Sequence, residues 1–478
     1  MASTAGSGTI GRAGVGGPAG SVQLANPSAT ALDLAGNLYI SDSLNHRVLR
    51  VSAITNLVSL VAGTGTAGFS GDGGPGVDAR LNAPTGLAVS GNILFIADTL
   101  NHRVRQVDLS TGTMLALAGS GPTDPQATFG SGALGGDGGP AAAARLNTPS
   151  GLASDGQNLY IADAFNSRIR RVSLSGSFVI TTVAGNGSNG APGDGGPPAA
   201  AALGRPGFIA FSPQGTLWVP DATNHRVWEI DFANDRIQIV AGTGERGYSG
   251  EGQPPLLAKL DGPVGVAFDF TGGALISEYG NHRIRRIHRA SNTITTIAGS
   301  GPAGTPVGSY AGDPGLGLSA RFSQPGGLTR APSGAIIVVD SLNNRIRTLT
   351  PAIPSSVPAM FNLTLTTSVV NGNTGQRTFH FDFIDADGDI TYNGTFRDAA
   401  VITVADPNRP GCTDLFISPA LGQPGNISGT VDFAITGGYV RRKSSPTPFP
   451  LLVTLDDAAG RRSDAVRVNV TEWFSFCP

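Results

Sequence analysis

The sequence predicts an all-β protein in which six copies of one four-stranded unit are followed by a smaller β-sandwich. Two observations lead to this prediction. A short segment recurs six times between residues 38 and 346, and the acidic residue within it returns every 56 to 65 positions. After Pro351 the recurrence stops, and a different pattern of short alternating segments begins. Self-similarity at a period of this length is typical of repeat architectures.

Each copy consists of an apolar run, an acid, a short polar turn, Asn, usually His, then Arg and a second apolar run. The second copy, Leu94 to Val104, shows the pattern clearly. Near-alternation of apolar residues is typical of half-buried strands, and Asp and Asn favour the turn between them. The repeated acid, Asn and Arg are Asp42, Asn45, Arg47, Asp98, Asn101, Arg103, Asp163, Asn166, Arg168, Asp221, Asn224, Arg226, Glu278, Asn281, Arg283, Asp340, Asn343 and Arg345.

We interpret these eighteen residues as structural, because a motif present in every repeat is usually what makes the repeat fold. The Arg is expected to reach the acid or the carbonyl groups of the turn. A functional alternative is a metal bound by the histidines of the motif, but radial symmetry would spread equivalent side chains too far apart to share one ion. Those histidines are His46, His102, His225 and His282.

At these residues the chain resembles the NHL-repeat family, whose namesake triplet matches Asn101-His102-Arg103 and its counterparts. The resemblance covers roughly residues 1–350 and implies a six-bladed β-propeller. Two copies have Ser167 or Asn344 in place of His, so the His is not required by the blade. We place the propeller at residues 1–352 and the second domain at residues 353–478.

The second copy predicts the four strands of one blade, from the innermost at 85–90 through 93–98 and 104–108 to the outermost at 114–118. The Gly-rich start of the chain matches the end of a later repeat, and the sixth copy has no fourth strand after it. A circular array must close to avoid an exposed edge. We therefore expect residues 1–6 to supply the outermost strand of the last blade, beside residues 345–349.

Alternating strand directions place the long Gly-rich loops and the motif turns on one face, and the short hairpins on the other. The loops carry a loose ring of acids on the motif face. Their simplest role is to set Gly-rich turns; the alternative is a ring that binds a cation or a polar ligand around a central channel. The acids are Asp72, Asp137, Asp194, Glu251 and Asp313.

The last 120 or so residues contain short alternating segments with turn signals between them, a pattern typical of a β-sandwich. The hairpin at 456–464 resembles the last hairpin of bacterial immunoglobulin-like or cadherin-like modules. Asp385, Asp387 and Asp389 could bind Ca²⁺, the one cofactor that the sequence suggests, or could simply form a turn. Cys412 and Cys477 are the only cysteines, and we expect them to form a disulfide in an oxidising compartment.

The composition narrows the classes of function. The formal charge of −2 provides no field that would recruit nucleic acid, and no apolar run is long enough to span a bilayer. Motifs for catalysis are absent, and no inner strand of the repeats carries a histidine. We therefore expect a secreted or surface-attached bacterial protein that binds a protein or glycan, with self-assembly left open. The alternative is a propeller enzyme of the lyase or lactonase type, acting at the central channel.

Overall fold

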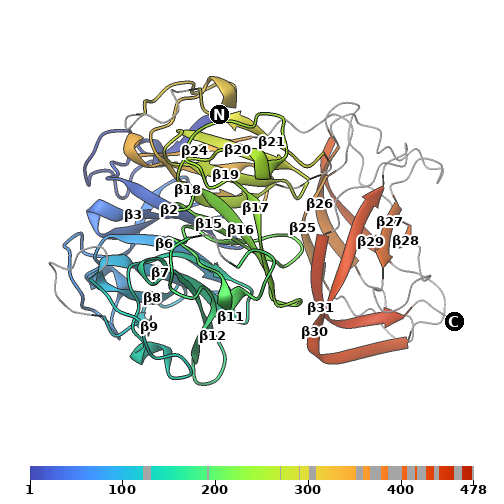
Figure 1. The fold of residues 1–478 in the computed structure, drawn as a ribbon, viewed down its shortest axis with the longest axis horizontal. Coiled ribbons are helices and arrows are strands. Elements are labelled where there is room, and N and C mark those ends of the chain that lie inside the picture. The colour runs from blue at the N-terminus through green and yellow to red at the C-terminus, as the bar shows by residue number, and fades with distance from the viewer. Residues whose placement is uncertain are drawn as a thin grey trace.

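The structure is a computed structural model, shown in Figure 1. It describes residues 1–121, 131–190, 193–269, 271–289, 291–300 and 308–350 with their side chains, and beyond these the backbone of strands between residues 359 and 475. Residues 1–350 fold into a six-bladed β-propeller, as the repeats predict. Each blade is a four-stranded antiparallel sheet, and the inner strands of neighbouring blades contact one another around the axis.

The strands run from the axis outward in chain order, except that the outermost strand of the sixth blade comes from the N-terminus. Blades 1 to 3 contain β2 (Pro27–Leu32), β3 (Leu38–Asp42), β4 (Arg47–Val51), β5 (Val58–Ala62); β6 (Pro84–Ser90), β7 (Ile93–Asp98), β8 (Arg103–Asp108), β9 (Met114–Ala118); β10 (Pro149–Ser154), β11 (Asn158–Asp163), β12 (Arg168–Ser173), β13 (Ile180–Ala184). Blades 4 to 6 contain β14 (Ala210–Phe211), β15 (Leu217–Asp221), β16 (Arg226–Asp231), β17 (Arg236–Ala241); β18 (Pro263–Phe268), β19 (Ala274–Glu278), β20 (Arg283–His288), β21 (Thr293–Ala298); β22 (Pro325–Arg330), β23 (Ile336–Asp340), β24 (Arg345–Leu349), β1 (Ala2–Ala5).

Short 3-10 helices occupy the connections of the motif face. Four form motif turns between the second and third strands: η2 (Ser43–Asn45), η4 (Thr99–Asn101), η6 (Ala164–Asn166) and η10 (Ser341–Asn343). Six lie in the segments that lead to the inner strands: η1 (Ala19–Ser21), η3 (Gly76–Asp78), η5 (Ala141–Ala143), η7 (Pro198–Ala200), η8 (Pro255–Leu257) and η9 (Gly317–Ser319).

The N-terminal strand closes the ring, at the place where the sequence analysis puts it. β1 pairs antiparallel with β24, with Ala2 opposite Thr348, and the N-terminus lies beside β24 in Figure 1. After β1 the chain turns at Gly6, whose φ is +93°. A Cβ atom there would lie 2.4 Å from the carbonyl oxygen of Asn344. Glycine is therefore needed for the chain to pass so close to the neighbouring backbone.

The apolar core lies between the blades. Each described cluster of buried apolar side chains joins two neighbouring blades, for example Phe95 of blade 2 with Ile161 of blade 3. The cluster at the closure packs Ala5, Leu24, Ile40 and Ile346 together, so it joins the two ends of the propeller. Burial of this apolar surface stabilises the ring.

The strands beyond the propeller form two antiparallel sheets. One orders β25 (Ala359–Thr366), β26 (Thr378–Asp385) and β29 (Ile427–Ala434); the other orders β28 (Leu415–Phe416), β27 (Val401–Ala405), β30 (Arg441–Asp456) and β31 (Val466–Ser475). The all-β character agrees with the sequence, whereas an immunoglobulin-like sandwich stays a prediction. No helix in the described parts of the chain has both the length and the hydropathy to cross a bilayer.

Candidate functional site

The acid of each repeat motif lies in the interior of its blade. Asp98 is fully buried and accepts hydrogen bonds from the Asn82 backbone N–H and the Asn101 side chain, each at 2.7 Å. Burial raises the pKa of Asp98 to about 6, although Arg105 and the two hydrogen bonds act in the opposite direction. The acid thus ties the motif turn to the segment before the inner strand, which is a structural role.

The Arg of the motif lies opposite the acid in the strand register, as Asp98 and Arg103 show. Among the ion pairs between described residues, Arg47 is the one motif arginine that pairs with its own motif acid, Asp42, at 2.7 Å. The others mainly donate to backbone carbonyls: Arg168 to Asn166 and Asn186, and Arg345 to Gly6 and Ser7. The last pair anchors the N-terminal segment to the sixth blade.

A second arginine, two residues further along, was missed by the sequence analysis. In four blades it is fully buried and bridges the motif acid to the acid of the long loop. Arg105 contacts Asp98 at 3.4 Å and Asp72 at 2.6 Å. The residues at this position are Arg105, Arg170, Arg285 and Arg347.

The sequence does carry a signal for this bridge, because the loop acid and the second arginine change together. In blade 1 both are apolar: Val15 stands in the loop and Leu49 in the strand. In blade 4 Trp228 replaces the arginine and points its indole N–H at Asp221, at 3.4 Å. The loop acid of that blade, Asp194, instead accepts the backbone N–H of Ile239.

The loop acids predicted to form a ligand-binding ring therefore all have protein partners. Asp137 contacts Arg170 at 2.7 Å, Glu251 contacts Arg285 at 3.1 Å and Asp313 contacts Arg347 at 2.5 Å. Burial acts to raise the pKa of Asp313, but the hydrogen bonds from Arg347 and Ser3 outweigh it and lower that pKa. Across the described residues, no three side chains of the metal-binding types come together. A ligand role for these acids stays a prediction.

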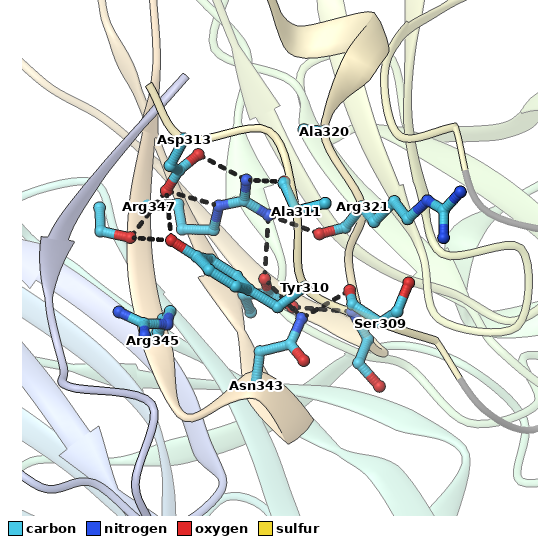
Figure 2. Close-up of polar contacts among 12 residues, drawn as sticks. Ser309, Tyr310, Ala311, Asp313, Ala320, Arg321, Asn343, Arg345 and Arg347 are labelled. Carbon is cyan, nitrogen blue, oxygen red and sulfur yellow. Dashed lines mark hydrogen bonds and ion pairs between the residues drawn. The ribbon is translucent and has the colours of Figure 1, made fainter. Parts of the chain in front are cut away.

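Figure 2 shows this network in the sixth blade. The Arg347 guanidinium donates to Asp313, Asp340 and the carbonyl groups of Ala311 and Arg321. The Tyr310 ring contacts this guanidinium and that of Arg345, whose guanidinium carbon lies 4.3 Å from the ring centroid. Such stacking adds to the ion pairs and fixes the long loop on the blade.

The motif histidines link neighbouring blades. His102 adopts a left-handed backbone conformation with φ of 54°, and its Nδ1 accepts the backbone N–H of Thr148 in the next blade at 2.9 Å. His46, His225 and His282 accept equivalent bonds. In the sixth blade Asn344 replaces His, and its Oδ1 accepts the N–H of Asn26 at 2.9 Å. The motif histidines therefore have a structural role: they join neighbouring blades.

The tips of the motif turns carry a large apolar side chain two residues after the motif acid in four blades, and Tyr279 one residue after it in the fifth blade. Each tip is held in position because its backbone N–H donates to the segment before the inner strand, as Leu44 does to Ala25 at 3.1 Å. Leu44, Tyr279 and Leu342 are 57%, 42% and 46% exposed, whereas Leu100 and Phe165 are half-buried. Because the blades are arranged radially, these residues form a ring, which we call the tip ring: Leu44, Leu100, Phe165, Tyr279 and Leu342.

Unpaired cations surround this apolar ring. Arg80, Arg145 and Arg321 are exposed in the long loops, and their guanidinium groups have no hydrogen-bond or ion-pair partner in the described part of the chain. Figure 2 shows the Arg321 guanidinium extending away from the network. Arg205 is exposed over the Phe165 ring, 4.2 Å from its centroid. Four of the five loop acids pair with buried arginines, so the exposed arginines of this face supply positive charge that these four acids do not neutralise.

A pocket of about 460 Å³ opens at the other end of the central channel, where the inner strands end. Its walls are mostly apolar, and Arg330 is the only charged residue among the described residues that line it. The sequence analysis did not single out Arg330.

Some predicted sites fall outside the described residues. Asp385 is the last residue of β26, but Asp387 and Asp389 are not described, so the calcium prediction stays open. Cys412 and Cys477 also lie outside the described residues, and the disulfide stays a prediction.

Comparison with known proteins supports the repeat assignment. No protein-family model matches the chain. It is 28% identical over 337 residues to Protein SUPPRESSOR OF QUENCHING 1, chloroplastic, of Arabidopsis thaliana, covering 67% of this chain and 30% of that protein. It is 26% identical over 349 residues to NHL repeat-containing protein 2 of Gallus gallus, covering 68% and 46%. NHL-repeat proteins are therefore homologues of this chain.

The chain spans less than half the length of these two relatives. Among solved structures, an auxiliary nutrient binding protein from Bacteroides thetaiotaomicron VPI-5482 matches with a TM-score of 0.51 and 16% identity, covering 73% of this chain and 75% of that one. At this level of identity the likeness concerns the fold.

Proposed function

We propose that the chain is a secreted or cell-surface binding protein whose propeller docks a protein partner on the motif face. The observation that carries this proposal is the tip ring. Large apolar side chains occupy the motif-turn tips of five blades, and three of them, Leu44, Tyr279 and Leu342, are exposed, although the buried network beneath them does not require an exposed leucine or aromatic residue. Exposed apolar side chains on one face of a rigid scaffold are typical of an interaction site.

The chemistry of this face favours a protein over a glycan and indicates an acidic partner. Three of the five tip residues are leucines, which pack well against apolar protein surfaces but offer no flat face or hydrogen bond to a sugar. The unpaired guanidinium groups of Arg80, Arg145 and Arg321 complement negative charge, which speeds association and orients the partner.

The enzyme alternative has less support. A lyase or lactonase acting at the channel would need acidic or histidine side chains that reach the lumen. Of the described residues that line the channel pocket, only Arg330 is ionisable, and the motif histidines are occupied between blades. Binding is therefore the function that the geometry supports best.

Site-specific photo-crosslinking in the native host tests the proposal. A photoreactive residue replaces Leu342 in one variant and Leu34 in a control; Leu34 lies in a hairpin of the opposite face and is 98% exposed. The captured partner is then purified, and its affinity is measured for the double variant Leu44→Glu/Leu342→Glu and for Leu34→Glu. We expect the double variant to lose affinity by about tenfold or more, since central apolar contacts dominate interfaces.

Two results would contradict the proposal. One is a partner that crosslinks equally from both faces and binds the double variant with wild-type affinity. The other is binding that is lost when a glycan is removed from the partner, which would make the ligand a glycan.

A further inference from the structure

The inner strands of the six blades place equivalent residues side by side where the channel opens opposite the motif face. In every blade, the residue five positions after the proline that begins the inner segment lines the pocket of about 460 Å³. In five blades this residue is apolar or a small serine, and in the sixth blade it is an arginine. The six residues are Leu32, Val89, Ser154, Phe211, Phe268 and Arg330.

Arg330 is the one lining side chain with unused hydrogen-bond donors. It is exposed in the pocket, and no described residue gives its guanidinium a hydrogen bond or an ion pair. The hydroxyl groups of the pocket are satisfied within the protein: Thr329 donates to the Thr30 carbonyl at 2.8 Å, and Ser154 donates to the Asn158 carbonyl at 3.0 Å.

Asp269 is the acid whose charge acts on Arg330, but its carboxylate already has other partners. It forms an ion pair with Arg286 at 2.6 Å and accepts hydrogen bonds from Thr271 and Gly273. The surrounding protein restricts solvation of Arg330 and lowers its pKa, while Asp269 acts in the opposite direction. An arginine nevertheless stays charged at neutral pH. Among the described residues, the positive charge of the pocket therefore has no counterion of its own.

We propose that the channel pocket binds a small amphipathic organic anion, with the anionic group held by Arg330 and the apolar body packed on the walls. A planar guanidinium can hold a carboxylate, sulfonate or phosphate through two parallel hydrogen bonds. Leu32, Val89, Phe211 and Phe268 provide the apolar surface, and the volume lies in the usual range for small-ligand sites. The site lies at the opposite end of the channel from the proposed protein interface and does not depend on it.

The plainer interpretation is that Arg330 is an ordinary solvated side chain at the end of a strand. A matched comparison separates the two. Arg289 is also exposed without a described partner, in the turn between β20 and β21 at the same end of the propeller, but it does not line the pocket. Any general effect of removing one positive charge should be the same for Arg289→Gln and Arg330→Gln.

The experiment titrates the full chain with two fluorescent probes that share a ring system. The anionic probe is 8-anilinonaphthalene-1-sulfonate and the neutral probe is N-phenyl-1-naphthylamine. We expect Arg330→Gln to weaken binding of the sulfonate by about tenfold, consistent with the loss of a charge-assisted pair, and to change the affinity for the neutral probe less than twofold. Arg289→Gln should change neither affinity, and circular dichroism should show that both variants fold.

Three results would overturn the proposal. The first is that the wild-type chain binds neither probe. The second is that Arg289→Gln weakens binding of the sulfonate probe as much as Arg330→Gln does. The third is that Arg330→Gln leaves the affinity for the sulfonate probe unchanged. Equal weakening of both probes by Arg330→Gln would also count against it, because that outcome indicates a change of pocket shape. Arg330→Lys, which retains the charge but not the planar fork, should show an intermediate loss.

Discussion

The buried arginine that joins two acids explains why the repeat keeps so many charged residues in its interior. Arg105 lies between Asp98, which is fully buried, and Asp72, which is 31% exposed at its side chain. A buried charge is costly without partners, so the loop acid and the motif acid are both needed to hold it. Removing one partner should therefore destabilise the blade without removing a specific activity.

Asp98→Ala should lower the free energy of unfolding by about 1–3 kcal/mol, since it removes the acceptor of the Asn82 N–H and one acceptor each from the buried side chains of Asn101 and Arg105. Asp98→Asn should cost about half as much, because an amide oxygen can still accept the Asn82 N–H and Arg105 keeps Asp72. Urea denaturation of both variants measures the difference. An Asp98→Ala variant as stable as the wild type would show that the acid is not part of the scaffold.

The motif histidine gives the fold a measurable dependence on pH. Burial, with a smaller contribution from Arg103, lowers the pKa of His102, since its Nδ1 must stay unprotonated to accept the Thr148 N–H. A lowered folded pKa means that this contribution is fully present above the unfolded value of about 6.5 and is lost as pH falls below it.

His102→Asn should keep the interblade hydrogen bond, because Asn344 makes it in the sixth blade with a similar φ of 51°. The difference in unfolding free energy between wild type and variant should therefore shift in favour of the variant between pH 7 and pH 5. Denaturant unfolding at both pH values measures this shift. Parallel pH profiles for the two proteins would count against the assigned role.

At the scale of the elements, the sequence predicts strand positions well. The strands expected at 93–98 and 114–118 are β7 and β9, because alternating apolar residues between Gly and Asn turns leave little choice of register. Side-chain partners are harder to predict. The sequence analysis expected the first arginine to reach the acid or the turn carbonyls, and both kinds of contact occur. It did not single out the second arginine, which contacts the acid in four blades, because the other partner of that arginine lies in a loop 33 or 34 residues away.

The role of Arg330 was hidden for a similar reason. Its chemistry depends on which residues of five other inner strands stand beside it, and that arrangement emerges only when the ring closes. Comparing the residue five positions after the first proline of each inner segment would have revealed Arg330 as the only charged member of the set.

Deletion of residues 1–7 should lower the melting temperature and promote oligomers. It removes β1 from β24, the hydrogen bonds that Arg345 donates to Gly6 and Ser7, and the Ala5 contact in the closing cluster. The exposed edge of β24 can then pair with another chain. Scanning calorimetry and light scattering test this, with Ser3→Ala as the control that keeps the strand. A truncated protein with an unchanged melting profile and no oligomers would refute the closure role.

At the scale of the whole molecule, the two cysteines provide a test of whether the protein is extracellular. We predict that Cys412 and Cys477 form a disulfide, which closes a loop of 65 residues and contributes roughly 4 kcal/mol in the chain-entropy model. Non-reducing electrophoresis with mass mapping of the full chain from its native compartment measures the pairing. A free thiol at either position would argue against the disulfide and weaken the proposal of an extracellular location.

The central claim is that the repeat motif builds a rigid scaffold whose motif face, through the tip ring, binds a protein. Hydrogen exchange of the full chain with and without the captured partner tests it most directly. The account predicts protection at the motif turns that carry Leu44, Leu100 and Leu342, with unchanged exchange in the hairpins at 33–37 and 269–273. Protection of those hairpins with no change at the motif turns would contradict it.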